Sequence, residues 1–217
     1  QAQRMPQDAW FPNRSWGSTG SGTGQFSTVR CVAVGPDGRI YATDYGNDRV
    51  QVFEPDGTFV RQWGDVTGPW GIAVSSSGLV FVAENNGYRI HVFESDGTSV
   101  RTWGESGSGA GQFNMPKGVA LAPDGRVWVV DSNSNRIQVF EPDGTFVRTF
   151  GGAGTLSGQF NLPRGISFAP DGTLFVADAG NNRIQVFDAE GDFLRSWSHT
   201  GPWDVAVSPD GLAYVAH

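Results

Sequence analysis

The feature that most constrains this chain is a pair of short segments that recur along it. One pattern, typified by VALAPDGRVWVVD, occupies residues 32–44, 72–84, 119–131, 166–178 and 205–217. A second, typified by RIQVFEPDGTFVRTFG, occupies residues 49–64, 89–104, 136–151 and 183–198. Equivalent positions recur after 40, 47, 47 and 39 residues, at Asp44, Glu84, Asp131, Asp178 and His217. A period of this length indicates a repeat architecture.

Within each copy, apolar and polar residues alternate over short runs that are separated by Asp-Gly or related turns, which predicts antiparallel hairpins. The 31 glycines and 12 prolines agree with many tight turns and leave little material for long helices. A four-stranded sheet cannot bury both faces alone, but sheets stacked around an axis cover one another. The predicted fold is all-β, a β-propeller of four-stranded antiparallel blades with five visible repeats, the last of them incomplete.

The repeat boundaries predict one domain over residues 1–217. Full repeats are expected at 26–64, 69–104, 113–151 and 160–198, and a partial repeat at 201–217. Residues 11–17 copy the end of the outer strand and are expected to close the last blade. We expect the chain to be a fragment of a five- or six-bladed ring that resembles a six-bladed propeller. The alternative is a ring that closes imperfectly.

Charge and hydropathy narrow the range of partners. The net charge of −7 disfavours nucleic acid, whose binding relies on a dense basic face. No apolar run approaches the roughly 18 residues of a membrane span, and no leader-like segment opens the chain. Cys31 is the only cysteine, so an internal disulfide is excluded and the compartment stays open. A secreted, periplasmic or extracellular sensor-type location is favoured over the cytoplasm, and the oligomeric state is not determined.

The pattern P-x-G-[VI]-A-[VL]-x-P-D-G-x-[VLI]-[WFY]-V-[AV]-D-x-x-N-N-R-I-Q-V-F is best shown by residues 163–187, which have Ser167 and Phe168 at its Ala and [VL] positions. This pattern resembles the NHL repeat, and the resemblance covers nearly the whole chain. Relatives in that family include protein-binding and RNA-binding modules, sensor domains of bacterial receptor kinases, and peptidyl-hydroxyglycine amidating lyases. The resemblance therefore implies a propeller, while function has to be argued from the site.

An acid and an arginine five residues apart recur in each full repeat, at Asp44/Arg49, Glu84/Arg89, Asp131/Arg136 and Asp178/Arg183. We interpret these pairs as structural, because a catalytic group has no need to be copied into every blade. The carboxylate is expected to accept turn amides and to hold the guanidinium bidentately. A second series precedes an aromatic residue in the outer strand and is also interpreted as structural: Arg14, Arg61, Arg101, Arg148 and Arg195.

The residue that opens each innermost strand is cationic or aromatic, and these residues are Arg30, Trp70, Lys117, Arg164 and Trp203. A small residue follows in most copies, as expected where inner strands crowd around the axis. We predict that the five form a ligand-binding ring at one mouth of the central channel, suited to an anionic or aromatic group. The alternative is that they are loop-end residues that fill space.

The amidating lyases carry zinc-binding histidines at this axial position, where this chain has Arg, Trp and Lys, which are not plausible zinc ligands. The histidines, His91, His199 and His217, are expected at the surface. Cys31 is expected to be a packed thiol, and Asp204 stands alone as an inward acid. The sequence predicts no catalytic residue, no metal site and no cofactor.

The leading hypothesis is a non-enzymatic binding scaffold for a protein, a peptide or a small anionic ligand. The first alternative is a propeller lyase or hydrolase of the amidating-lyase type, with its catalytic residues outside this chain. The second alternative is single-stranded RNA binding across the basic mouth, whose affinity would fall steeply with salt.

Overall fold

The computed structural model describes residues 15–217, which form four antiparallel sheets of four strands each and a fifth sheet of two. Blade 1 comprises β3 (Val29–Val34), β4 (Ile40–Asp44), β5 (Arg49–Phe53) and β6 (Phe59–Trp63). Blade 2 comprises β7 (Pro69–Val74), β8 (Val80–Glu84), β9 (Arg89–Phe93) and β10 (Ser99–Trp103). Blade 3 comprises β13 (Pro116–Leu121), β14 (Val127–Asp131), β15 (Arg136–Phe140) and β16 (Phe146–Gly151).

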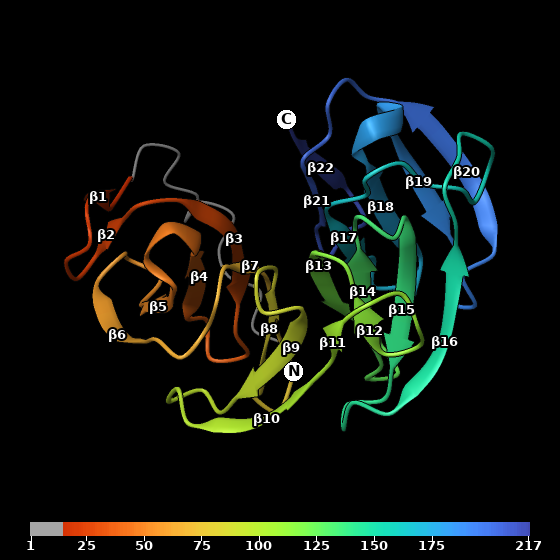
Figure 1. Ribbon diagram of the computed structural model, residues 1–217. Helices are drawn as coiled ribbons and strands as arrows, with labels where there is room; N and C mark the ends of the chain where they lie inside the picture. Colours follow the sequence, from red (N-terminus) through yellow and green to blue (C-terminus); the bar gives the residue numbers. More distant parts are fainter. Residues whose placement is uncertain (1–14) are drawn as a thin grey trace.

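Blade 4 comprises β17 (Ile166–Phe168), β18 (Leu174–Asp178), β19 (Arg183–Phe187) and β20 (Phe193–Ser198), and the fifth sheet comprises β21 (Asp204–Val207) and β22 (Ala213–Ala216). Two connectors form small parallel pairs, β1 (Ser18–Thr19) with β2 (Gln25–Phe26) and β11 (Glu105–Ser106) with β12 (Gln112–Phe113). In Figure 1 the first strands of the sheets lie toward the centre, and the fourth strands lie at the periphery. This is the all-β propeller arrangement that the repeats predict.

The hairpin turns follow from the Pro-Asp-Gly sequences. In the turn between β3 and β4, Asp37 Oδ1 accepts the amide N–H of Arg39 at 3.1 Å, and Gly38 takes a left-handed φ of 83°. Asp143 and Gly144 repeat this geometry between β15 and β16, with a φ of 95° at the glycine. Glycine adopts this backbone conformation without steric cost, whereas a Cβ would strain it. The turn chemistry therefore fixes the strand ends locally.

The turns between second and third strands are different. In blades 1 and 4 they contain single 3-10 turns, η2 (Tyr45–Asn47) and η3 (Ala179–Asn181). Each ends in a left-handed residue, Asp48 at φ 49° and Asn182 at φ 52°. Asp and Asn tolerate this region better than most side chains. These turns place the acid at the end of the second strand opposite the arginine that starts the third.

Each of the inner strands β3, β7 and β13 contains a register irregularity at the predicted axial residue. In β13, Pro116 pairs with Asp131 and Val119 with Val129, so Lys117 and Gly118 lie opposite the single residue Val130. Such a β-bulge bends the strand and re-aims the side chain at that point. The bulge therefore positions the axial residue independently of the regular in-and-out alternation of the strand.

Apolar side chains fill the spaces between neighbouring blades. The outer-strand aromatic of one blade packs on the third-strand Phe of the next, with ring centroids 5.7 Å apart for Trp63 and Phe93 and 5.9 Å apart for Trp103 and Phe140. A Cβ on Gly144 would lie 2.9 Å from the Trp103 ring, so this turn glycine also makes room for the aromatic side chain. The repeated aromatic is thus an inter-blade contact, consistent with its structural interpretation.

Trp16 takes the same position relative to blade 1, with its ring 6.3 Å from that of Phe53 and in contact with Gly57. The remainder of the predicted closing strand, including Arg14, lies outside the described residues. Residues 15–17 belong to no strand. The expectation that residues 11–17 close the last blade therefore stays a prediction.

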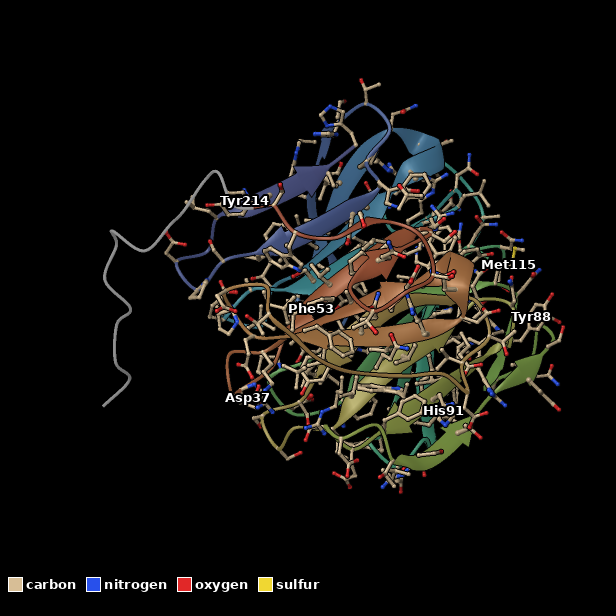
Figure 2. All side chains as sticks on the ribbon, turned by 90° about the vertical axis from the view of Figure 1, so that its left-hand side faces the viewer. Asp37, Phe53, Tyr88, His91, Met115 and Tyr214 are labelled. Atoms are coloured by element: carbon tan, nitrogen blue, oxygen red, sulfur yellow. The ribbon has the colours of Figure 1, made fainter. Side chains whose placement is uncertain are left out.

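Residues 15–217 form four complete blades and one two-stranded sheet, as five repeats with an incomplete last copy predict, and not six blades. Apolar side chains remain exposed at the two ends of the array: Val32 and Val34 on β3 are 58% and 66% exposed, and Tyr214 on β22 is 55% exposed (Figure 2). These faces lack the blade-on-blade packing that covers the others. Among the described residues, no helix is long and apolar enough to cross a membrane.

Candidate binding site at the channel mouth

The five predicted axial residues lie together in the structure. Trp70 and Trp203 stack, with centroids 5.9 Å apart and ring planes 15° apart. The Arg164 guanidinium carbon lies 3.9 Å from the Trp203 ring centroid, and that of Arg30 lies 4.3 Å from the Trp70 centroid and 5.3 Å from that of Trp203. Lys117 Nζ lies 5.0 Å from the Trp70 centroid. We call these five residues the mouth cluster.

Tyr45 also belongs at this site, and the sequence interpretation missed it. Its ring meets Trp70 edge-on with centroids 5.6 Å apart, and the Arg30 guanidinium carbon lies 5.0 Å from its centroid. Tyr45 directly follows the acid Asp44, where the other complete blades have Asn85, Ser132 and Ala179. The only signal in the sequence was therefore this departure from the repeat.

The cations of the mouth cluster have aromatic partners but no acidic ones. Within residues 15–217, no ion pair involves Arg30, Lys117 or Arg164, and the buried Nε atoms of both arginines lack a hydrogen-bond partner. Burial, with the nearby charges of Arg164 and Arg30, lowers the pKa of Lys117 to about 8. Burial and Arg30 also lower the pKa of Arg164. Three cations thus repel one another in a partly desolvated place, which an anion would relieve.

A cavity of about 440 Å³ runs along the inner strands of all five sheets, and its lining includes four members of the mouth cluster. Lys117 is not among the lining residues and contacts the cluster through Trp70. The inner strands approach closely: Gly118 N–H donates to Arg164 O at 3.0 Å, and a Cβ on Gly118 would lie 2.5 Å from that oxygen. Crowding at the axis therefore explains the small residue that follows most mouth residues.

Cys31 and Asp204, which stand where the other copies have glycine, also line the cavity. Burial, and secondarily the charge of Asp204, raises the pKa of the Cys31 thiol to about 12. Burial raises the pKa of Asp204 to about 6, against the opposing effect of a hydrogen bond from Val205 N–H. The thiol is therefore protonated at neutral pH and is a poor nucleophile.

The acid–arginine pairs lie outside the mouth cluster, and in blades 1, 3 and 4 the arginine holds the glycine-rich connector. In blade 3, Arg136 Nε donates to Asp131 Oδ2 at 2.8 Å, and its Nη atoms donate to the carbonyl oxygens of Ser108, Gly109 and Gln112 at 2.8–2.9 Å. The expected bidentate grip is wrong, because the terminal nitrogens bind the connector instead. Equivalent Nε contacts of 2.9, 3.0 and 2.7 Å join Arg49–Asp44, Arg89–Glu84 and Arg183–Asp178.

The histidines divide into one buried and two more accessible residues. His91 was expected at the surface, and this prediction is wrong, because its side chain is buried against Phe93 and bonded to Glu84. His199 is half-buried and His217 is exposed, with ring centroids 5.6 Å apart. In the part of the chain that the structure describes, no three His, Cys, Asp or Glu residues gather as potential metal ligands.

Four-stranded blades around a channel, with a ligand-sized cavity along the axis, define the class of this protein as a β-propeller. The chain belongs to the NHL repeat family, whose profile matches residues 26–53, 67–93, 113–140 and 160–187. A search of curated protein sequences gives no match.

Solved structures with the same fold include enzymes and a binding protein. Virginiamycin B lyase from Staphylococcus aureus is 20% identical at a TM-score of 0.70, with 89% of this chain and 64% of that chain covered. A gluconolactonase from Xanthomonas campestris is 20% identical at a TM-score of 0.72, with 88% of this chain and 70% of that chain covered. The nidogen/laminin complex contains a chain that is 22% identical at a TM-score of 0.70, with 87% of this chain and 71% of that chain covered. This chain thus spans less than two thirds of the length of the lyase, and these similarities show the fold alone.

Proposed function

We propose that this chain is a binding scaffold and that the mouth cluster recognises an anionic group of a protein, a peptide or a small ligand. The observation that carries the proposal is the set of three cations, Arg30, Lys117 and Arg164, that have no acidic partner among residues 15–217. Guanidinium groups bind carboxylates through charge-assisted hydrogen bonds, so a carboxylate in the cavity can accept from Arg30 and Arg164, which line it.

The aromatic members give the site a second recognition element. Trp70 and Trp203 hold the cations over their ring faces, so the guanidinium groups are oriented before a ligand arrives. Pre-oriented donors lose less conformational entropy on binding than free side chains. The stacked indoles also provide an apolar face beside the charged groups, which favours a carboxylate attached to an apolar or aromatic body.

The fold neighbours support a binding role and an enzymatic role equally, since they include lyases, a gluconolactonase and the nidogen/laminin complex. The chemistry of the mouth cluster favours binding. Arginine and tryptophan are not acid–base or metal-binding groups at neutral pH, and the Cys31 thiol beside them has a pKa of about 12. A basic mouth also suits RNA, but the net charge of −7 opposes it.

The test is calorimetric titration with benzoate, succinate, citrate and an acidic peptide, at two salt concentrations. We expect binding of at least one carboxylate, with affinity lost in the triple variant R30A/K117A/R164A. The control is R39A/R126A/R195A, which removes the same charge from half-buried or exposed arginines outside the mouth cluster. Because an anion favours protonated Lys117, whose pKa is about 8, binding should tighten as pH falls through 8. Equal affinity in the two triple variants, or no binding of any probe, would overturn the proposal.

A further inference from the structure

Blade 2 departs from the repeat at two positions that face each other. His91 stands where the third strands of the other complete blades have Gln51, Gln138 and Gln185. Ser99 stands where their fourth strands have Phe59, Phe146 and Phe193. The two departures occur in the same blade and join side chains that the other blades do not join, so we treat them as one feature.

These two residues and Glu84 form a continuous relay of hydrogen bonds. His91 Nδ1 lies 2.8 Å from Glu84 Oε1, and His91 Nε2 lies 2.7 Å from Ser99 Oγ. Both distances fall within the hydrogen-bond reach of about 2.6–3.2 Å expected of a nucleophile and its base. The order of groups is hydroxyl, imidazole, carboxylate, with the two ring nitrogens used on opposite sides.

The surroundings of Glu84 set the direction of this relay. Its other oxygen, Oε2, accepts the amide N–H of Thr67 and the Nε–H of Arg89, both at 3.0 Å. The N–H groups on Oε2 leave Oε1 to accept a hydrogen bond from His91, so Nδ1 is the ring nitrogen that donates. Nε2 is then an acceptor, and the hydroxyl of Ser99 donates to it. This is the tautomer in which an imidazole takes the proton of an attacking hydroxyl.

Burial leaves only the reactive end of the relay accessible. Glu84 and His91 are buried, and the imidazole packs against the Phe93 ring at 3.9 Å between centroids, which fixes its orientation. Ser99 is exposed at the start of β10, which is the fourth strand of its blade and is therefore remote from the channel axis. Figure 2 labels His91, the partner of Ser99. A buried acid and base that end at an exposed hydroxyl are the arrangement that a surface nucleophile needs.

We propose that Ser99 is an activated nucleophile that accepts acyl groups from small activated esters, with His91 as its base and Glu84 as the positioning residue. Ser99 Oγ attacks the carbonyl carbon while His91 Nε2 takes the hydroxyl proton. The carbon–oxygen bond to the alcohol breaks, and the alcohol leaves with that proton. Water, deprotonated by His91, then cleaves the acyl-serine to release the acid and restore the hydroxyl. This site goes beyond the proposed binding function and is independent of the mouth cluster.

The first experiment uses a fluorophosphonate probe and intact-mass measurement of the folded chain, followed by peptide mapping. A phosphorus–oxygen bond forms at Ser99, the phosphorus–fluorine bond breaks, and fluoride leaves. We expect one adduct at Ser99, its loss in S99A, a rate at least tenfold lower in H91Q, and an unchanged rate in S77A. H91Q installs the side chain that the other blades carry, so it preserves the fold. Absence of an adduct at Ser99, or an equal rate in H91Q, would overturn the proposal.

A second measurement keeps the test independent of serine probes. Ser99→Cys and Ser95→Cys place thiols on the same exposed hairpin, and only the first can contact His91. We expect iodoacetamide to alkylate S99C at least tenfold faster than S95C, because the imidazole promotes the thiolate. Hydrolysis of p-nitrophenyl acetate should fall to the background rate in S99A, while S77A retains it. Equal alkylation rates, or an unchanged hydrolysis rate in S99A, would contradict an activated Ser99.

Discussion

Blades 2 and 3 use the same acid–arginine pair for different purposes. In blade 3 a long glycine-rich connector precedes the blade, and Arg136 donates to three of its carbonyl oxygens. In blade 2 the connector over residues 64–68 is short, and Arg89 donates only through Nε to Glu84, with its side chain 34% exposed. The comparison teaches that the arginine is primarily a clamp for the connector, and that a short connector releases it.

The third-strand position that holds Gln138 in blade 3 and His91 in blade 2 also contacts the connector in blade 3 but not in blade 2. Gln138 Nε2 donates to the connector carbonyl of Gln112 at 2.7 Å, and its Oε1 accepts the N–H of Gly111 at 3.0 Å. Blade 2 has no equivalent connector atoms, and His91 turns to Ser99 instead. This position therefore binds connector backbone in blade 3 and a side chain in blade 2.

The largest expected effect comes from removing the buried acid of a clamped blade. D131A leaves Arg136 without its ion pair and Asn114 N–H without its acceptor, so it should destabilise the fold by about 3–5 kcal/mol. Urea unfolding checks this value. The control is D171A, an exposed turn acid that accepts hydrogen bonds from the neighbouring Thr173, for which less than about 1 kcal/mol is expected. Equal losses in the two variants would contradict a clamp.

The next largest effect should be the difference in stability loss between variants of Arg136 and Arg89. R136A removes three hydrogen bonds to connector carbonyls as well as the ion pair, and we expect a loss of about 2–3 kcal/mol. R89A removes one partly exposed ion pair, and we expect about 1 kcal/mol or less. Hydrogen exchange should accelerate in residues 105–113 of R136A only. A larger loss in R89A than in R136A would break the comparison between the blades.

Asp204, a partly buried acid, provides a further test of what an arginine partner contributes to stability. Asp178 has Arg183 beside it, whereas Asp204 has no ion-pair partner among residues 15–217 and its pKa is raised to about 6. A raised pKa means that stability is greatest with the acid protonated and falls as pH rises through 6. D204N should therefore add on the order of 2 kcal/mol at pH 7 and flatten the pH dependence between 4 and 6. Thermal melting at pH 4 and 7 measures this, and an unchanged pH profile would exclude Asp204 as its source.

The smallest effects should come from exchanging the third-strand residues. Q138H removes two connector hydrogen bonds and should destabilise by about 1–2 kcal/mol. H91Q loses only the bonds to Glu84 and Ser99 and should destabilise by about 1 kcal/mol or less. Matched urea titrations of the two variants give the difference. A greater loss in H91Q would mean that His91 is required for the fold of blade 2.

Much of the mouth cluster was predictable because it recurs at one position of the repeat. Residues at the same position of each repeat come to a common axis when the blades are arranged radially. The sequence alone therefore groups Arg30, Lys117 and Arg164. Tyr45 could not be grouped with them, because it lies in a turn whose conformation depends on its neighbours. The aromatic faces under each cation were also not predictable, since the bulges that aim these side chains leave no separate mark in the sequence.

The sequence by itself determined the hairpins, the blade repeat and the axial register, because these follow from local turn chemistry and strict alternation of apolar residues. Tertiary structure alone decided the partners of each polar group: connector carbonyls for Arg136, aromatic faces for Arg30, and Ser99 for His91. The physical reason is that a backbone turn needs only adjacent residues. A hydrogen bond between separate strands depends instead on connector length and strand register, which only the packed blades fix.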